Sequence, residues 1–194
     1  TGERSYFDRC EIHGTVDFIC GGGDNFYDQC DIIIEDRGGN VIAAPNSVPT
    51  LKWGYVFSNC TISAVEGAKE AIDGSYNLGR PWQNEPRIAY INTKMNILPD
   101  ANGWTGMSTL TTHFYEYGSV DKNGKAIDLS VRGNSSTSTN KYTPILTKEQ
   151  ADAHTIYNVM ATSTDGWLPT DYTSLTSAPK NIKVEEGRIS WDND

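Results

Sequence analysis

Long apolar segments are absent from the sequence, and basic residues are few. No stretch of about 18 consecutive apolar residues occurs, which excludes a membrane-spanning helix. Lys and Arg number 16 against 25 Asp and Glu, giving a net charge of -9. Because phosphate binding requires a basic surface, this balance makes nucleic acids and anionic membranes poor partners. An acidic polysaccharide is not excluded, and we expect it to bind best with its charges masked as esters.

Histidine and cysteine are also few, and their spacing is not that of metal ligands. The three histidines are scattered, and no Cys-x-x-Cys pair occurs among the four cysteines. We therefore expect no zinc site. An even number of cysteines permits two disulfides in three alternative pairings.

A six-residue pattern recurs in the first half of the chain. In each copy an aromatic residue lies three positions before a Cys, and an Ile lies two positions after it. The copies occupy residues 7–12, 27–32 and 57–62, with a looser copy at 90–95. Repeats of this size fit a solenoid, in which each copy adds one turn.

The spacing within each copy predicts short strands separated by bends. The Cys and the Ile are two apart and share one face of a strand, whereas the aromatic residue requires a bend before the Cys. Stretches rich in Gly and Asn, such as residues 21–25 and 37–40, supply turns. We therefore predict an all-β solenoid.

Stacked turns would place Cys10, Cys30 and Cys60 at equivalent inward positions. We expect a ladder of small, buried thiols. Disulfides between neighbouring turns are the alternative, because adjacent parallel strands lie about 4.8 Å apart, a separation that a disulfide can bridge.

The character of the sequence changes after residue 96. A strand is expected over residues 109–117, and a short helix over 148–154. Thr147 and Gln150 stand in the positions of a capping box, which predicts the start of that helix.

Two segments carry residues suited to chemistry. The first, Gly-Thr-Val-Asp-Phe-Ile-Cys-Gly at 14–21, places Asp17 in an apolar run, where a carboxylate is costly unless it is paired. The second, Leu-Gly-Arg-Pro-Trp at 78–82, offers the guanidinium fork of Arg80 and the flat face of Trp82. Taken singly, the first segment favours a structural role for Asp17, as a capping or paired carboxylate. The second is also weak evidence alone, because a surface turn with a packing Trp would explain it.

Together the two motifs resemble the paired signature of the pectin methylesterases. The turn at 99–104 and the Tyr-Glu-Tyr segment at 115–117 fit the same family. The resemblance implies a right-handed parallel β-helix, with residues 1–169 forming the C-terminal part of the family domain. Residues 170–180 then read as a linker, and 181–194, with two short strands around a Glu-Gly turn, resemble the start of a fibronectin type III module.

The resemblance also implies roles for individual residues. Asp17 matches the nucleophile that attacks a galacturonate methyl ester, expels methanol and forms an acyl-enzyme. Arg80 matches the arginine that keeps this aspartate ionised and aimed, and Trp82 the tryptophan that packs on the sugar. Val16 and Met107 match positions that line the substrate groove. No metal or organic cofactor is implied, and a pectin-degrading enzyme is expected to be secreted, extracellular or periplasmic.

Two departures from the family matter. Cys20 stands where the family usually has an aromatic residue, which weakens stacking at one subsite. The general acid/base aspartate and an oxyanion-hole glutamine belong to a Gln-Asp-Thr-Leu segment upstream of the Val-Asp-Phe motif, and this chain begins after that place. We therefore expect a truncated solenoid with little activity alone and with an open first turn that favours self-association.

Three other functions are compatible with parts of the sequence. A β-helix polysaccharide lyase would need Ca²⁺, for which Asp24, Asp28 and Asp31 are candidate ligands. A non-catalytic carbohydrate-binding or scaffold β-helix would need neither motif for chemistry. A thiol nucleophile at Cys20 is disfavoured, because no histidine is placed in sequence to pair with it.

Overall fold

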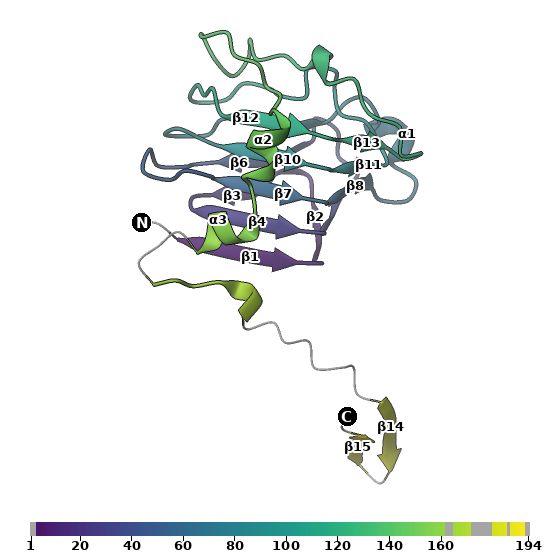
Figure 1. Ribbon diagram of the computed structural model, residues 1–194. Coiled ribbons are helices and arrows are strands. Elements are labelled where there is room, and N and C mark those ends of the chain that lie inside the picture. Colours follow the sequence, from purple (N-terminus) through teal and green to yellow (C-terminus); the bar gives the residue numbers. More distant parts are fainter. Residues whose placement is uncertain (1–2, 162–164, 172–179, 186, 193–194) are drawn as a thin grey trace.

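The computed structural model describes residues 3–161, 165–171, 180–185 and 187–192, and most of its strands stack in three parallel sheets (Figure 1). Sheet A has the order β1 (Arg4–Asp8), β4 (Asp24–Asp28), β7 (Tyr55–Ser58), β10 (Ile88–Ile91), β12 (Phe114–Tyr117). Sheet B has the order β2 (Glu11–Gly14), β5 (Asp31–Ile34), β8 (Thr61–Ala64), β11 (Lys94–Met95), β13 (Val120–Asp121). Sheet C has the order β3 (Val16–Gly21), β6 (Val41–Pro45), β9 (Asn77–Gly79).

The chain visits these sheets in turn, so that each coil, or rung, begins on sheet A and passes through sheet B. Every pairing within the three sheets is parallel, as in β1 with β4 and β2 with β5. The predicted parallel β-helix is therefore confirmed.

The aromatic residues of the repeat form a continuous stack inside the helix. Register places Phe7, Tyr27, Phe57 and Tyr90 at equivalent positions of successive strands. Consecutive ring centroids are 4.7, 4.6 and 4.4 Å apart, with nearly parallel planes. These rings supply much of the core, because aromatic side chains bury more apolar surface than most others.

The predicted bend before each cysteine is a single residue with left-handed backbone. Arg9, Gln29, Asn59 and Asn92 have φ of 48°, 53°, 54° and 52°. This conformation turns the chain from sheet A into sheet B and brings the next side chain inward. Cys30 and Cys60 are buried as expected, whereas Cys10 at the equivalent position is only partly buried. Buried Thr93 takes the equivalent place in the looser copy, and all four cysteine thiols are free.

A buried ion pair terminates the aromatic stack. Glu116 stands opposite Tyr90 in the register of β10 and β12. Its carboxylate accepts a hydrogen bond of 2.7 Å from Nε of Arg132, and both side chains are almost wholly buried. Removing one partner would leave the other as an unpaired buried charge, so this end of the β-helix depends on both residues.

Two short helices cover the outer face of sheet A. The capping box of Thr147 and Gln150 forms as predicted, and α2 (Lys148–Asp152) ends two residues before the expected boundary. A second helix, α3 (Ile156–Met160), was not predicted; Thr155 caps it. Their apolar side chains pack with Phe26, Val56 and other residues of sheet A.

The remaining elements are short. They are α1 (Lys69–Ile72), the 3-10 turns at Leu129–Val131 and Pro169–Asp171, and an antiparallel hairpin of β14 (Lys180–Glu185) and β15 (Arg188–Asp192). The expected strand at 109–117 forms only over its second half, as β12. Most of the expected linker lies outside the described residues. Among the helices of the described ranges, none is long and apolar enough to cross a membrane.

Candidate active site

Asp17 occupies an irregular position in β3. Pairing with β6 shifts register between Val16 and Ile19, so the strand bulges at this point. Asp17 itself has a φ of 52°, in the left-handed region. Such a conformation costs a non-glycine residue on the order of 1 kcal/mol. The bulge turns the Asp17 side chain out of the regular alternation of the strand.

The glycine that opens this motif makes room for the bulge. A Cβ added at Gly14 would lie 2.2 Å from atoms of the Phe18 side chain. Phe18 in turn packs against the core. The pattern Gly-Thr-Val-Asp-Phe is therefore one local unit, in which Phe18 folds back over Gly14 while Asp17 is presented at the surface.

Arg80 follows β9 and reaches Asp17 across the middle strand of sheet C. Its backbone N–H donates to the Ala43 carbonyl at 2.9 Å, which extends the pairing of β9 with β6. Its side chain donates from Nε to Oδ1 of Asp17 at 2.8 Å and from Nη2 to Oδ2 at 2.5 Å. The two residues are 63 positions apart in sequence, and the structure brings them together in a bidentate pair.

Gly79 allows the close approach that positions this arginine. A Cβ there would lie 2.5 Å from Cδ1 of Ile88 and 3.1 Å from the Ala43 carbonyl oxygen. A larger residue before Arg80 would therefore require the Ile88 side chain and the Ala43 carbonyl to shift.

Both members of the ion pair are part-exposed. The side chains of Arg80 and Asp17 are 27% and 21% exposed. A part-exposed ion pair contributes about 0–1 kcal/mol, which roughly offsets the backbone strain at Asp17. Hydrogen bonds to Asp17 raise the pKa of Arg80, so the guanidinium remains charged.

The other predicted site residues lie on the same strands or on the loops beside them. Val16 and Cys20 belong to β3, and Cys20 is exposed. Trp82 is half-buried, and its backbone N–H donates to the Pro45 carbonyl oxygen at 3.3 Å. Met107 is 40% exposed. Its loop is hydrogen-bonded to the chain on both sides of Arg80, through the carbonyls of residues 79 and 81.

An exposed amide cluster beside Trp82 was missed by sequence reasoning. Asn46 donates to Oε1 of Gln83 at 3.3 Å, and Asn84 donates to Asn46. These contacts join the loop after Trp82 to the loop after β6. Amides can both donate to and accept from sugar hydroxyls. Gln83 and Asn84 directly follow the Leu-Gly-Arg-Pro-Trp motif in the sequence, but their contact with Asn46 depends on the fold.

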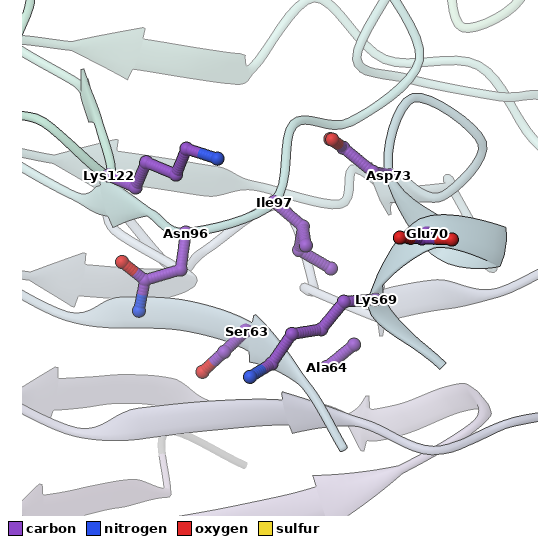
Figure 2. A pocket seen from close by; sticks show the side chains of 8 residues that line it. All are labelled: Ser63, Ala64, Lys69, Glu70, Asp73, Asn96, Ile97 and Lys122. Carbon is purple, nitrogen blue, oxygen red and sulfur yellow. The ribbon is translucent and has the colours of Figure 1, made fainter. Parts of the chain in front are cut away.

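A separate concavity lies on sheet B. A cavity of about 460 Å³ opens between β8, α1 and the chain after β13, with Lys69, Lys122, Asn96 and Asp73 around it (Figure 2). It shares no residue with the Asp17–Arg80 pair, and we assign it no part in the chemistry.

The candidate calcium ligands are not grouped as a site. Asp24 is buried and accepts hydrogen bonds from the N–H groups of Trp53 and Gly54, and Asp28 accepts one from Tyr6. Across the part of the chain that the structure describes, no group of three or more His, Cys, Asp or Glu is placed to hold a metal ion.

Comparison with known proteins identifies the family. The pectinesterase family model matches residues 1–163. The chain belongs to the pectinesterase family. Among curated pectinesterases, pectinesterase A of Emericella nidulans is 31% identical over 128 residues, which cover 66% of this chain and 38% of that protein. The probable pectinesterase/pectinesterase inhibitor 47 of Arabidopsis thaliana is 31% identical over 86% of this chain and 26% of its own length.

Solved pectin methylesterases share the fold. The enzyme from Yersinia enterocolitica has a TM-score of 0.62 and 25% identity, covering 84% of this chain and 55% of its own. The enzyme from Aspergillus niger has a TM-score of 0.58 and 27% identity, covering 76% and 46%. The right-handed parallel β-helix expected from the motifs is confirmed by these pectinesterase relatives. This chain spans about half the length of the solved chains.

Proposed function

We propose that this chain carries the nucleophilic half of a pectin methylesterase active site, which hydrolyses the methyl esters of polygalacturonate. The bidentate contact of Arg80 with Asp17 is the observation that supports this most. In this contact a part-exposed carboxylate, held in a strained backbone, is paired with a fixed cation. Trp82 follows on the same loop. Membership of the pectinesterase family makes ester hydrolysis the reaction to test.

In the proposed reaction, Asp17 attacks the ester carbonyl carbon of a methylated galacturonate. The bond between that carbon and the methoxy oxygen breaks, and methanol leaves with a proton from a general acid. Water then cleaves the resulting acyl-aspartate, which releases the galacturonate carboxylate and restores Asp17. Arg80 keeps the Asp17 carboxylate oriented throughout, through its two hydrogen bonds to it. Trp82, Val16, Met107 and Cys20 contact the sugar chain around the reacting ester.

The general acid is the part that this chain does not supply. Its 194 residues contain no Gln-Asp-Thr-Leu segment. General acid–base catalysis contributes about 10²–10⁴-fold and one oxyanion donor about 10²–10³-fold. We therefore expect this chain alone to release almost no methanol from methylated pectin. Turnover equal to that of a complete pectin methylesterase would contradict the assignment of roles.

Product analysis of the full-length protein separates the esterase from a lyase. We expect methanol and an otherwise unchanged polymer, with no dependence on added Ca²⁺. An unsaturated uronide, formed by chain cleavage, would instead support the lyase. Binding without either product would support a carbohydrate-binding scaffold.

The first rung is the proposed surface for self-association. Each of the strands β1, β2 and β3 lies at an edge of its sheet. Phe7, Cys10 and Ile12 are only partly buried, whereas their equivalents in the next rung are buried. Open edges with apolar side chains favour pairing with another chain. Light scattering should show a mass that rises with concentration, and a monomer at every concentration would count against the proposal.

We also propose the remaining organisation from sequence. Residues 1–169 form the C-terminal part of the esterase domain, 170–180 a linker and 181–194 the start of a fibronectin type III-like module. The hairpin of β14 and β15 is consistent with such a start. A polymeric cell-wall substrate requires a secreted enzyme, extracellular or periplasmic, and cell fractionation tests this.

A further inference from the structure

The cavity on sheet B is lined on one side by polar side chains from three neighbouring strands. Ile62 and Met95 point into the core and are 0% and 1% exposed. The residues that follow them, Ser63 and Asn96, therefore point outward. The Asn96 N–H donates to the Ile62 carbonyl at 2.8 Å, which continues the pairing of β8 and β11 past the end of β11. Lys122 directly follows β13, the next strand of the sheet (Figure 2).

The polar groups of these three side chains have no partner among the described residues. The Ser63 hydroxyl and the Asn96 amide make no hydrogen bond there, and Lys122 makes no ion pair. Lys94 of β11 and Lys125, after β13, likewise make no ion pair within the described ranges. In a chain whose net charge is -9, this corner of sheet B therefore presents cations and hydrogen-bond donors that are available to a ligand.

The opposite side of the cavity, formed by α1 and the residue after it, offers acceptors. The Lys69 ammonium is paired with Glu66 at 2.7 Å. Glu70 lies in the first turn of α1, and Asp73 directly follows the helix. Asp73 accepts a hydrogen bond from the Leu98 N–H through Oδ1 at 2.6 Å, which leaves Oδ2 for another donor. Figure 2 shows Glu70 and Asp73 across the cavity from Ser63, Asn96 and Lys122.

This distribution of charge fits a sugar that carries one carboxylate. The cavity volume of about 460 Å³ lies within the range of about 300–1,000 Å³ that is usual for small-molecule sites. Buried Ala64 and Ile97 line it and offer apolar contact to the C–H groups of a ring. The free ammonium suits a carboxylate, and Glu70 and Asp73 can accept from hydroxyls. The same two carboxylates would repel a dianion such as phosphate.

We propose that this cavity is a second carbohydrate site, which binds a de-esterified galacturonate unit through Lys122, Asn96 and Ser63. Lys122 pairs with the uronate carboxylate, and Asn96 and Ser63 form hydrogen bonds with the hydroxyls. A methyl ester has no charge for Lys122, so the site prefers the product of the proposed reaction to its substrate. The identity of the sugar as galacturonate rests on the proposed function, whereas the preference for a carboxylate rests on the cavity itself.

Calorimetric titration of the 194-residue chain tests the site, with fully de-esterified and fully methyl-esterified galacturonate oligosaccharides as the two ligands. Lys122→Gln should weaken binding of the de-esterified ligand about 5–10-fold, because the carboxylate loses its charged partner. Binding of the methyl ester should not change. Lys148→Gln on α2 makes the same change in charge over sheet A and should leave both affinities unaltered. Equal weakening by the two lysine variants, or no binding of the de-esterified ligand by the wild-type chain, would overturn the proposal.

Two further variants separate this cavity from the proposed active site. Asn96→Asp adds a negative charge without a change in size and should weaken binding of the de-esterified ligand about 10-fold or more. Its unfolding midpoint should stay at the wild-type value, because the Asn96 side chain is exposed. In a Trp82→Ala background, Lys122→Gln should still weaken binding by the same factor. Binding that is lost in Trp82→Ala alone and is insensitive to Lys122→Gln would overturn the second site.

The titrations do not depend on turnover, so the two proposals can fail separately. Absence of methanol release by the full-length protein would contradict the esterase proposal. Carboxylate-selective binding that requires Lys122 would still establish the cavity as a site for acidic sugars.

Discussion

Sheets A and C belong to the same solenoid but use its repeat differently. In sheet A, Phe7, Tyr27, Phe57 and Tyr90 repeat one position in register, and their rings stack in the core. In sheet C, β3 bulges at Asp17, and the register with β6 shifts. Regular positions thus build the scaffold, and the break in regularity presents the ionisable group that we propose for catalysis. The comparison predicts that changes in the stack affect stability, and changes at the bulge affect turnover.

The largest effect on stability is expected from the aromatic stack. Phe57 is fully buried between Tyr27 and Tyr90. Phe57→Ala should lower the free energy of unfolding by about 3–5 kcal/mol, because it removes core contacts and leaves a cavity. Tyr157, which is 64% exposed, is the control. Tyr157→Ala should change the free energy of unfolding by less than about 0.5 kcal/mol. Similar values for both in denaturant titrations would show that the stack does not hold the rungs together.

A change at the bulge should reverse this pattern. Arg80→Lys keeps the positive charge but loses the fork that holds both oxygens of Asp17. In the full-length protein we expect kcat for methanol release to fall about 10²-fold, while the unfolding midpoint changes little. Arg9→Lys, at an exposed ion pair, should leave kcat unchanged. A fall in stability without a fall in kcat would make the Asp17–Arg80 pair structural.

Trp82 tests the binding role of the same surface. Trp82→Ala should raise KM for methylated pectin about 10-fold and change kcat less, since aromatic packing contributes about 0.5–1.5 kcal/mol beyond area burial. The exposed Trp191 of β15 gives the control substitution. An unchanged KM would remove Trp82 from the proposed sugar-binding surface.

The smallest expected effect is on the pH dependence of stability, to which two histidines contribute in opposite directions. Burial beside Trp53 lowers the pKa of His154, so its contribution to stability is full above pH 6.5 and is lost as pH falls below that value. Hydrogen bonds to Glu35 and Glu11 raise the pKa of His13, so its contribution is present below pH 6.5 and is lost as pH rises through the raised pKa. Unfolding midpoints of His154→Gln and His13→Gln across this range should therefore change in opposite directions relative to wild type.

Sequence reasoning predicted the scaffold better than the site geometry. The recurring pattern of an aromatic residue, a Cys and an Ile predicted the rungs, because a parallel solenoid repeats its inward positions. The left-handed residues Arg9, Gln29 and Asn59 were anticipated only as a bend. Helix α3 was missed because a five-residue helix that packs on sheet A carries little periodic signal. The bulge at Asp17 was missed because an apolar run indicates a regular strand.

The meeting of Asp17 and Arg80 could be inferred only from the paired motifs. Nothing in the spacing of 63 residues fixes which rungs hold them, because the loops between strands differ in length. The amide cluster of Asn46, Gln83 and Asn84 depends on two loops meeting, which local patterns do not encode. Such contacts are tertiary, and the sequence of either loop alone does not specify them.

Methanol release by the full-length protein carrying Asp17→Asn tests the central claim most directly. Asn retains the size and the left-handed backbone preference of Asp, so the unfolding midpoint should be unchanged. Removal of a catalytic nucleophile should lower kcat by about 10⁴-fold or more, whereas Asp31→Asn on the outer face of sheet B should leave kcat at the wild-type value. Wild-type turnover by a folded Asp17→Asn protein would contradict the claim that Asp17 is the nucleophile.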